Sequence, residues 1–328
     1  MSLSVCVERA HELSRVISEY VWDCDCMLLS GGVDTTFVGL SKSRWNGRFK
    51  YAVTVVYDDA GVDLEYARLV SRRVAEKHVV VRFGLREADE ALPHVLAIIR
   101  SIDPVEVSCD IPLYIGLKKC LELGCEKVAT GDGGDELFAG YSFLLKKTPE
   151  YILEWVRSVP DKWFLPSKLI GEHLGVKVKQ SFTCKEAIEL ARKTPFECMV
   201  NEHDGVKYGK YLLRLLIQEE GYPSIAWRRK DPVNHGSGSV LLIKTWASRA
   251  SLEHYRSHDL NVEFTNRFKP HIYLYSVYRE LGLKKPAFKG GIPCPICGCS
   301  VSNKFCRFCG AVVDSKGKLV AMHSDGII

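Results

Sequence analysis

The sequence predicts an α/β protein with a parallel sheet flanked by helices, followed by a helical C-terminal part and a small zinc ribbon. Short apolar segments at 26–29, 51–57, 78–83 and 126–130 have the composition of buried strands. Segments with helical spacing of apolar residues separate them, and this alternation is typical of a parallel sheet. Near the end, four cysteines stand in two C-x-x-C-G pairs, a spacing typical of a zinc site.

Each predicted helix depends on apolar residues that recur at helical spacing. Residues 7–20 place Val7, Ala10, Leu13, Val16 and Ile17 on one face, and residues 62–76 do so with Leu64, Ala67, Val70 and Val74. A helix is expected directly after the first strand, beginning near Phe37, and others at 86–100 and 111–123. The segment 231–239 is rich in glycine and is expected to be a long loop that closes over substrate.

Composition limits the class of protein. Of 328 residues, 46% are hydrophobic and 26% charged, which is ordinary for a globular protein, and the net charge of +5 is mild. No apolar run approaches the roughly 18 to 20 residues that cross a bilayer, and Met1 to Glu8 lacks the pattern of a secretory signal. We therefore expect a cytoplasmic protein without a membrane partner. Its 13 cysteines are expected to be reduced or to bind metal, with Cys24 and Cys26 as small buried residues.

The first candidate site is the loop Ser30-Gly31-Gly32-Val33-Asp34-Thr35-Thr36, which follows the first strand and begins a helix. Glycines let the backbone approach phosphate oxygens, and the free N–H groups of a helix start face an anion. The hydroxyl groups add donors, and Asp34 can hold magnesium. No Gly-Lys-Ser/Thr follows the glycines, so the loop is not of the Walker type.

The second candidate site is the run from Thr130 to Tyr141, Thr-Gly-Asp-Gly-Gly-Asp-Glu-Leu-Phe-Ala-Gly-Tyr, at the end of the fourth strand. Its carboxylates at 132, 135 and 136 crowd negative charge on a flexible loop, which costs repulsion unless a cation or a proton lies among them. Ligands of parallel sheets bind at the carboxyl ends of strands, where both loops stand.

The two motifs resemble known ones. The first is similar to the SGGxDS signature of the ATP pyrophosphatases, or PP-loop enzymes, which have an adenine nucleotide alpha hydrolase-like fold. The second resembles the G-[DE]-G-[GS]-D-E-[LI]-F-[GA]-G-Y stretch of asparagine synthetase-type synthetase domains. Further similar segments are 63–68, 112–114, Lys210 to Arg214 and Ala226 to Asp231. The resemblance covers roughly residues 20 to 260.

This resemblance implies roles for particular residues. It implies ATP and Mg²⁺ as ligands, with Asp34 and Asp135 on magnesium. Asp132, where relatives often have Glu, would act on the incoming amine, and Lys230 would stabilise charge on the α-phosphate. The residues implied for pyrophosphate are Ser30, Gly31, Gly32, Asp34, Thr35, Thr36 and Gly131, and those implied for adenine are Leu28 and Val55.

The implied reaction is the adenylation of aspartate or a similar small carboxylate, followed by attack of ammonia to give an amide and AMP. An N-terminal glutaminase domain of the usual kind is not expected, because residue 2 is Ser and about 20 residues precede the first strand. Ammonia would then come from solution or from a separate glutaminase. A second interpretation is a PP-loop enzyme that adenylates a tRNA base, with the ribbon contacting RNA, and a third is a non-enzymatic nucleotide sensor.

The C-terminal cysteines predict a structural Zn²⁺ site made by Cys294, Cys297, Cys306 and Cys309, with Cys299 as a spare thiol. Four thiolates leave no open coordination position, and so short a module needs the metal in order to fold. The predicted organisation is an N-terminal helix at 1–22, the synthetase-like domain at 23–282, a linker at 283–293 and the zinc ribbon with its hairpin at 294–328.

Overall fold

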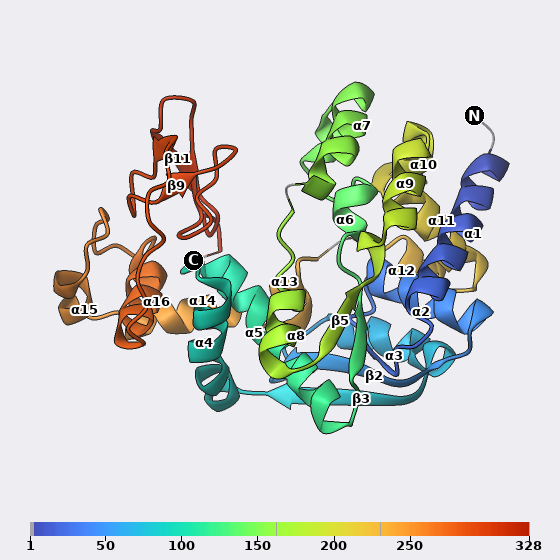
Figure 1. The fold of residues 1–328 in the computed structure, drawn as a ribbon, viewed down its shortest axis with the longest axis horizontal. Coiled ribbons are helices and arrows are strands. Elements are labelled where there is room, and N and C mark those ends of the chain that lie inside the picture. Colours follow the sequence, from blue (N-terminus) through green and yellow to red (C-terminus); the bar gives the residue numbers. More distant parts are fainter. Residues whose placement is uncertain (1–2, 162, 230, 328) are drawn as a thin grey trace. The chain divides into compact units, whose positions relative to one another are not determined.

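We describe the protein from a computed structural model, which covers residues 3–161, 163–229 and 231–327 (Figure 1). The chain divides into two compact units, and the boundary passes through strands β2 and β3 and helix α5. Unit 1 consists of 1–55, 62–81 and 116–231, and unit 2 of 56–61, 82–115 and 232–328. Each unit is described by itself.

A five-stranded sheet organises unit 1, with the strand order β3-β2-β1-β4-β5. Strand β1 pairs in parallel with β2 on one side and with β4 on the other, and β4 pairs in parallel with β5. The strands are β1 (Cys26–Leu28), β2 (Phe49–Tyr57), β3 (Ala75–Phe83), β4 (Lys127–Thr130) and β5 (Lys177–Gln180). The chain order reverses between β1 and β4, and the carboxyl ends of strands at such a switch point are where open α/β sheets bind ligands.

The helices of unit 1 agree with the alternation that the sequence predicts, and α5 crosses into unit 2. They are α1 (Leu3–Tyr20), α2 (Val33–Trp45), α3 (Asp63–Val74), α5 (Pro104–Glu122), α6 (Gly134–Leu137), α7 (Pro149–Ser158), α8 (Ser167–Leu174), α9 (Lys185–Lys193), α10 (Phe196–Met199), α11 (Tyr211–Glu219) and α12 (Pro223–Ala226). Short 3-10 turns lie at Leu144–Lys146, Val159–Asp161 and Ser181–Thr183, and β6 (Val200–His203) forms an antiparallel pair with β7 (Val206–Gly209).

Helices lie on both faces of the sheet because successive side chains of β1 point to opposite faces. A Cβ placed at Gly39 of α2 would lie 3.3 Å from the sulfur of Met27, whereas one at Gly116 of α5 would lie 3.0 Å from Leu28. On the α2 side, α1, α2 and α11 pack against one another and bury Leu13, Phe37 and other residues that are completely inaccessible. The predicted fold class is therefore confirmed.

The predicted helix at 111–123 begins too late, because α5 starts at Pro104 and continues through Pro112. A proline inside a helix removes the hydrogen bond to the carbonyl four residues earlier, here that of Ser108. The hydroxyl of Ser239 donates to this carbonyl at 2.6 Å, which replaces the lost partner. The sequence prediction began the helix at residue 111, beside Pro112, because the sequence near the proline does not show that Ser239 supplies the replacement donor.

Unit 2 is mostly helical and contains α4 (Leu85–Ile99), α13 (Val233–Ser237), α14 (Leu241–Arg249), α15 (Leu252–Ser257) and α16 (Lys269–Glu280). The expected loop at 231–239 is wrong in part, because α13 occupies it and Asn234 is buried with a 3.0 Å hydrogen bond to Ser108. Two small hairpins end the unit, β8 (Ile292–Pro293) with β9 (Ser300–Val301) and β10 (Ala311–Val313) with β11 (Leu319–Met322).

Among the described residues, none of the helices combines the length and the apolar character needed to cross a bilayer.

Candidate functional site

The first loop, between β1 and α2, is held by hydrogen bonds among its own hydroxyl groups. Ser30 Oγ lies 3.1 Å from Thr35 Oγ1 and accepts a 3.1 Å hydrogen bond from the N–H of Gly32, the residue that caps α2. Thr36 is fully buried, and its hydroxyl has no hydrogen-bond partner among the described residues. The loop therefore presents the start of a 13-residue helix with Asp34 in its first turn.

Gly31 is required by two independent constraints. Its φ of +72° is a conformation that side chains disfavour, and a Cβ there would lie 2.3 Å from the backbone nitrogen of Ala67 in α3. The first loop is thus pressed against α3, and this glycine has a steric reason in addition to any contact with phosphate.

The second loop follows β4 and lies directly against the first. A Cβ at Gly131 would lie 3.1 Å from the backbone nitrogen of Thr35, and one at Gly134 would lie 2.3 Å from Asp34 Oδ1. The two glycines allow this approach, as parallel strands β1 and β4 end side by side. The structure therefore brings together the two loops that the sequence singles out.

Asp34 and Asp135 converge on Lys210, which lies just before α11. The Lys210 Nζ is 2.5 Å from Asp34 Oδ2 and 2.8 Å from Asp135 Oδ1. The lysine side chain is 3% exposed, and each aspartate side chain is 18% exposed. Burial lowers the pKa of Lys210, but Asp135 and Asp34 outweigh it and raise the pKa above its ordinary value.

This geometry fits a divalent cation. Two carboxylates from separate loops already share the ammonium group of Lys210, and carboxylate oxygens are the protein ligands that Mg²⁺ prefers. The predicted magnesium residues thus lie close enough to bind the same ion, and their role as ligands stays a prediction.

Asp132 lies at the end of β4 with its Oδ2 accepting hydrogen bonds from Ser167, at the start of α8, and from Thr130 at 2.7 Å. Gln180 in turn donates to the Ser167 hydroxyl at 2.8 Å. Burial raises the pKa of Asp132, and the Ser167 and Thr130 hydroxyls act in the opposite direction. Asp132 is therefore half-buried and held by two hydroxyl donors, and its predicted catalytic role stays a prediction.

Glu136 and Tyr141 form a further pair beside the second loop. The Tyr141 hydroxyl donates to Glu136 Oε1 at 2.6 Å. Burial, and then the neighbouring charge of Asp135, raise the pKa of Glu136 to about 7. The second motif thus contains a carboxyl group that changes charge near neutrality.

Arg228 joins the basic segment after α12 to the first loop. Its guanidinium donates to the carbonyl of Gly31 at 3.3 Å and to Asp63 at 3.0 Å, and it lies 3.9 Å from the ring centroid of Tyr66. Arg228 is therefore anchored between the first loop and α3. Lys230, the predicted catalytic lysine, lies outside the described residues.

The residues predicted to contact adenine, Leu28 and Val55, lie on the face of the sheet covered by α5. A Cβ at Gly116 would lie 3.0 Å from Leu28 and 2.9 Å from Val55. Both side chains are partly exposed. The two residues are thus neighbours on one face, and their contact with adenine stays a prediction.

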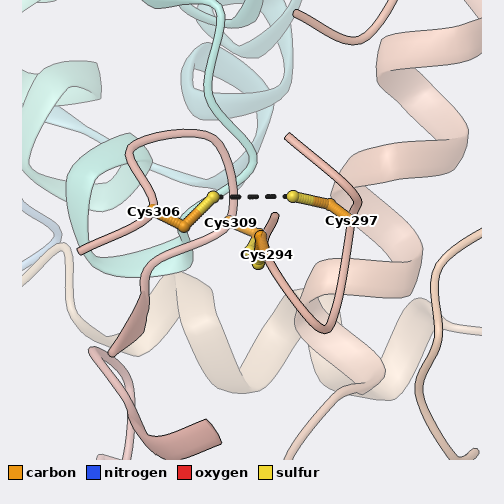
Figure 2. A group of neighbouring side chains, drawn as sticks. All are labelled: Cys294, Cys297, Cys306 and Cys309. Carbon is orange, nitrogen blue, oxygen red and sulfur yellow. Dashed lines mark hydrogen bonds between the residues drawn. The ribbon is translucent and has the colours of Figure 1, made fainter. Parts of the chain in front are cut away.

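In unit 2, the four predicted zinc ligands form one buried cluster (Figure 2). The sulfurs of Cys294 and Cys309 are 3.6 Å apart and those of Cys297 and Cys306 are 3.5 Å apart, and all four lie within 4.8 Å of one another. Tetrahedral Zn–S bonds of about 2.3 Å place sulfurs about 3.8 Å apart, so the cluster fits zinc. Cys299 is not a member of this group.

The second C-x-x-C-G pair, from Cys306 to Gly310, is here called the second knuckle, and it is packed into unit 2. The carbonyl of Phe308 accepts a 2.7 Å hydrogen bond from Ile102, and its ring contacts Tyr275 and Tyr278 edge-on. His271 Nε2 lies 3.1 Å from the carbonyl of Cys309. Tyr275 and Tyr278 are both buried in α16, so they serve packing.

The expectation that the cysteines are reduced or bind metal is wrong for four of them. Disulfides join Cys6 to Cys198 and Cys26 to Cys125, so Cys26 is a bridged residue. Cys24 is a free buried thiol, as predicted. Both bridges lie in unit 1, with sequence separations of 192 and 99. Pairs so far apart leave no local spacing from which they could be predicted.

Sequence reasoning missed Lys210, Arg228 and Ser167 as members of the site. Lys210 and Arg228 lie in segments that were noted for their resemblance to asparagine synthetase-type domains, so the sequence pointed to these segments. It does not show which of their side chains face the two loops. Ser167 lies 35 residues from Asp132 and has no such signal.

Comparison with known proteins agrees with the motifs. Residues 26–179 match the family model described as asparagine synthase. Asparagine synthetase B [glutamine-hydrolyzing] of Escherichia coli is 24% identical over 246 residues, 65% of this chain and 41% of that protein. The asparagine synthetase [glutamine-hydrolyzing] of Zea mays is 25% identical over 65% of this chain and 39% of its own length.

The probable asparagine synthetase [glutamine-hydrolyzing] of Dictyostelium discoideum is 25% identical over 69% of this chain and 44% of its own length. The chain thus spans about two fifths of the length of these curated relatives. The two motifs and the sheet order agree with these matches, and residues 26–179, somewhat less than half of the chain, are similar to the asparagine synthase family.

Proposed function

We propose that the protein is an ATP-dependent amide ligase that releases AMP and pyrophosphate. One observation supports the proposal most strongly. Asp34 and Asp135, from the loops after β1 and β4, both pair with the buried ammonium group of Lys210. Such a pair can hold the magnesium of MgATP across the pyrophosphate that leaves. Magnesium, when bound, would neutralise the charge that builds on the leaving pyrophosphate.

The proposed reaction has two steps. An oxygen of a substrate carboxylate attacks the α-phosphorus of ATP, the bond to the β-phosphate oxygen breaks, and an acyl-adenylate and pyrophosphate form. Ammonia then attacks the acyl carbon, loses a proton and displaces AMP, which gives the amide. Aspartate or a similar small acid is the proposed carboxylate, and the ammonia comes from solution or from a separate glutaminase.

The chain's own residues would bind and orient the reactants. The N–H groups of the first loop and the hydroxyls of Ser30 and Thr35 would hold pyrophosphate oxygens at the start of α2. Asp132, held by Ser167 and Thr130, would accept the proton of the incoming amine. Lys230 would stabilise charge on the α-phosphate.

For the zinc ribbon we propose a structural Zn²⁺. Its four thiolates fill the coordination shell, and the contacts of Phe308 and Cys309 with Ile102 and α16 give the second knuckle a packing role within unit 2. The second knuckle thus has a packing role that needs no RNA. This supports the amide-ligase proposal over the alternative in which the ribbon contacts RNA.

The test is ATP–pyrophosphate isotope exchange with aspartate, with a panel of small acids and with bulk tRNA. Exchange that depends on aspartate or on another small acid is expected, and Asp34→Ala and Lys230→Ala should each reduce it to background while circular dichroism stays native. Exchange that depends on tRNA alone would favour base adenylation instead. If both variants retained carboxylate-dependent pyrophosphate release, the assignment would be rejected.

A further inference from the structure

Lys210 occupies the position between the two aspartates that the proposed function assigns to magnesium. Its Nζ lies 2.5 Å from Asp34 Oδ2 and 2.8 Å from Asp135 Oδ1, and its side chain is 3% exposed. A lysine is almost never buried to this extent unless it is paired. Here the pairing partners are the two predicted metal ligands themselves.

The backbone fixes this lysine against the second loop. The N–H of Lys210 donates to the carbonyl of Phe138 at 2.7 Å, and its φ of +56° is unusual for a residue other than glycine. A Cβ at the preceding Gly209 would lie 1.9 Å from the carbonyl oxygen of Ala139, and one at Gly140 would lie 2.1 Å from Lys210 Cε. The backbone of Lys210 is thus held in a defined position, which directs its side chain to the aspartates. A flexible surface lysine would lack this constraint.

We propose that Lys210 is a placeholder cation, a positioning residue that keeps Asp34 and Asp135 together before metal binds and that a divalent ion displaces. The inference rests on the proposed assignment of the two aspartates to magnesium, and it does not require that any carboxylate be adenylated.

A divalent ion can displace Lys210 because of the charges that meet at this position. Without a cation, two half-buried carboxylates that lie within reach of one atom repel each other, and the loops that carry them separate. One ammonium lowers that repulsion with a single positive charge at the midpoint of the pair, and the buried guanidinium of Arg214 also attracts both aspartates. A divalent ion brings two positive charges to the same position, so it can replace the ammonium, at the cost of breaking two ion pairs that Lys210 makes.

The test compares Lys210→Met with wild type in two measurements without nucleotide. Methionine keeps an unbranched side chain as far as the ε position and removes the charged ammonium group. The metal-free variant is expected to unfold several degrees below wild type. Its dissociation constant for Mn²⁺, measured by electron paramagnetic resonance, is expected to fall by about tenfold or more, because no ammonium has to be displaced.

Lys42→Met is the matched control, because Lys42 is also a buried lysine, 4% exposed, but donates to the carbonyl of Trp22. It should lower stability and leave Mn²⁺ affinity unchanged. The double variant Asp34→Asn/Lys210→Met removes opposite charges together and is expected to fold even if Lys210→Met does not. Its metal-free stability should then exceed that of Lys210→Met.

An unchanged or weaker Mn²⁺ affinity in folded Lys210→Met would overturn the placeholder role. If Lys210→Met fails to fold, the double variant Asp34→Asn/Lys210→Met decides the question. The placeholder role would be overturned if the double variant were no more stable than Lys210→Met. Absence of Mn²⁺ binding by wild type would overturn the magnesium assignment as well, so the two failures are distinguishable.

Discussion

Unit 1 contains the site formed by the loops after β1 and β4, here called the paired-loop site, and unit 2 contains the cysteine cluster. The two sites are assembled in opposite ways. All four ligands of the cluster lie between Cys294 and Cys309, so their spacing in the chain already specifies the site. The paired-loop site combines side chains near residues 34, 135, 210 and 228, which only the folded sheet brings together. The first kind of site can be predicted from spacing, whereas the second needs the topology.

The largest effect is expected from loss of zinc. Cys306→Ser or a strong chelator should remove the metal and unfold the ribbon, because structural zinc contributes on the order of 10 kcal/mol to the folding of such modules. Metal analysis and hydrogen exchange of residues 294–322 would measure both changes. Cys299→Ser is the matched control and should keep one zinc per chain, because this thiol is outside the cluster. Far less than one zinc per folded wild-type chain would defeat the assignment.

A second large effect is expected at Gly31, where the paired-loop site depends on close packing. Gly31→Ala should lower the free energy of unfolding by more than about 3 kcal/mol, because its Cβ would collide with α3. Gly47→Ala has a similar positive φ of +76° with nothing within 4 Å, and should cost only about 1 to 2 kcal/mol. Urea unfolding of both variants isolates the steric part, and equal costs would show that the contact with α3 is unimportant.

Ser167→Ala tests the support of Asp132. Losing a donor to a half-buried carboxylate should cost about 1 to 2 kcal/mol and raise the pKa of Asp132 further, so the loss should be largest at high pH, where the carboxyl is charged. Ser181→Ala is the control, because that buried hydroxyl has no partner among the described residues, and it should be nearly neutral. Similar costs for the two variants in urea at pH 8 would contradict the interpretation.

The smallest effect is expected at His323, which lies 2.6 Å from the buried Asp103. Burial lowers the pKa of His323, but Asp103 outweighs it and raises the pKa above the ordinary value. A raised pKa stabilises the fold below pH 6.5, and this contribution disappears as pH rises through the folded-state pKa. His323→Gln should therefore lose less than about 1 kcal/mol at pH 6, because the ring is half exposed, and nothing at pH 9. A loss in urea unfolding that does not depend on pH would contradict the role of the charge.

The sequence predicted the parallel sheet, the two loops and the cluster of four cysteines because each depends on local spacing. It could not predict the disulfide of Cys26 with Cys125, the donor that Ser239 supplies inside unit 2, or the pairing of Lys210 with Asp34, which are 176 residues apart. These features depend on which segments become neighbours in space. The same limit explains why the contacts of Arg228 with Gly31 and Asp63 were not predicted, although its segment was noted for its resemblance.

The most direct test of the account is the binding of Mn²⁺–ATP, followed by electron paramagnetic resonance, in wild type, Asp34→Asn, Asp135→Asn and the double variant. If both loops hold the same ion, wild type binds one Mn²⁺ per chain and each single variant weakens it at least about tenfold. The double variant should then differ from the sum of the two losses, because residues that share a ligand couple. Wild-type affinity in either single variant would show that the two aspartates do not share an ion.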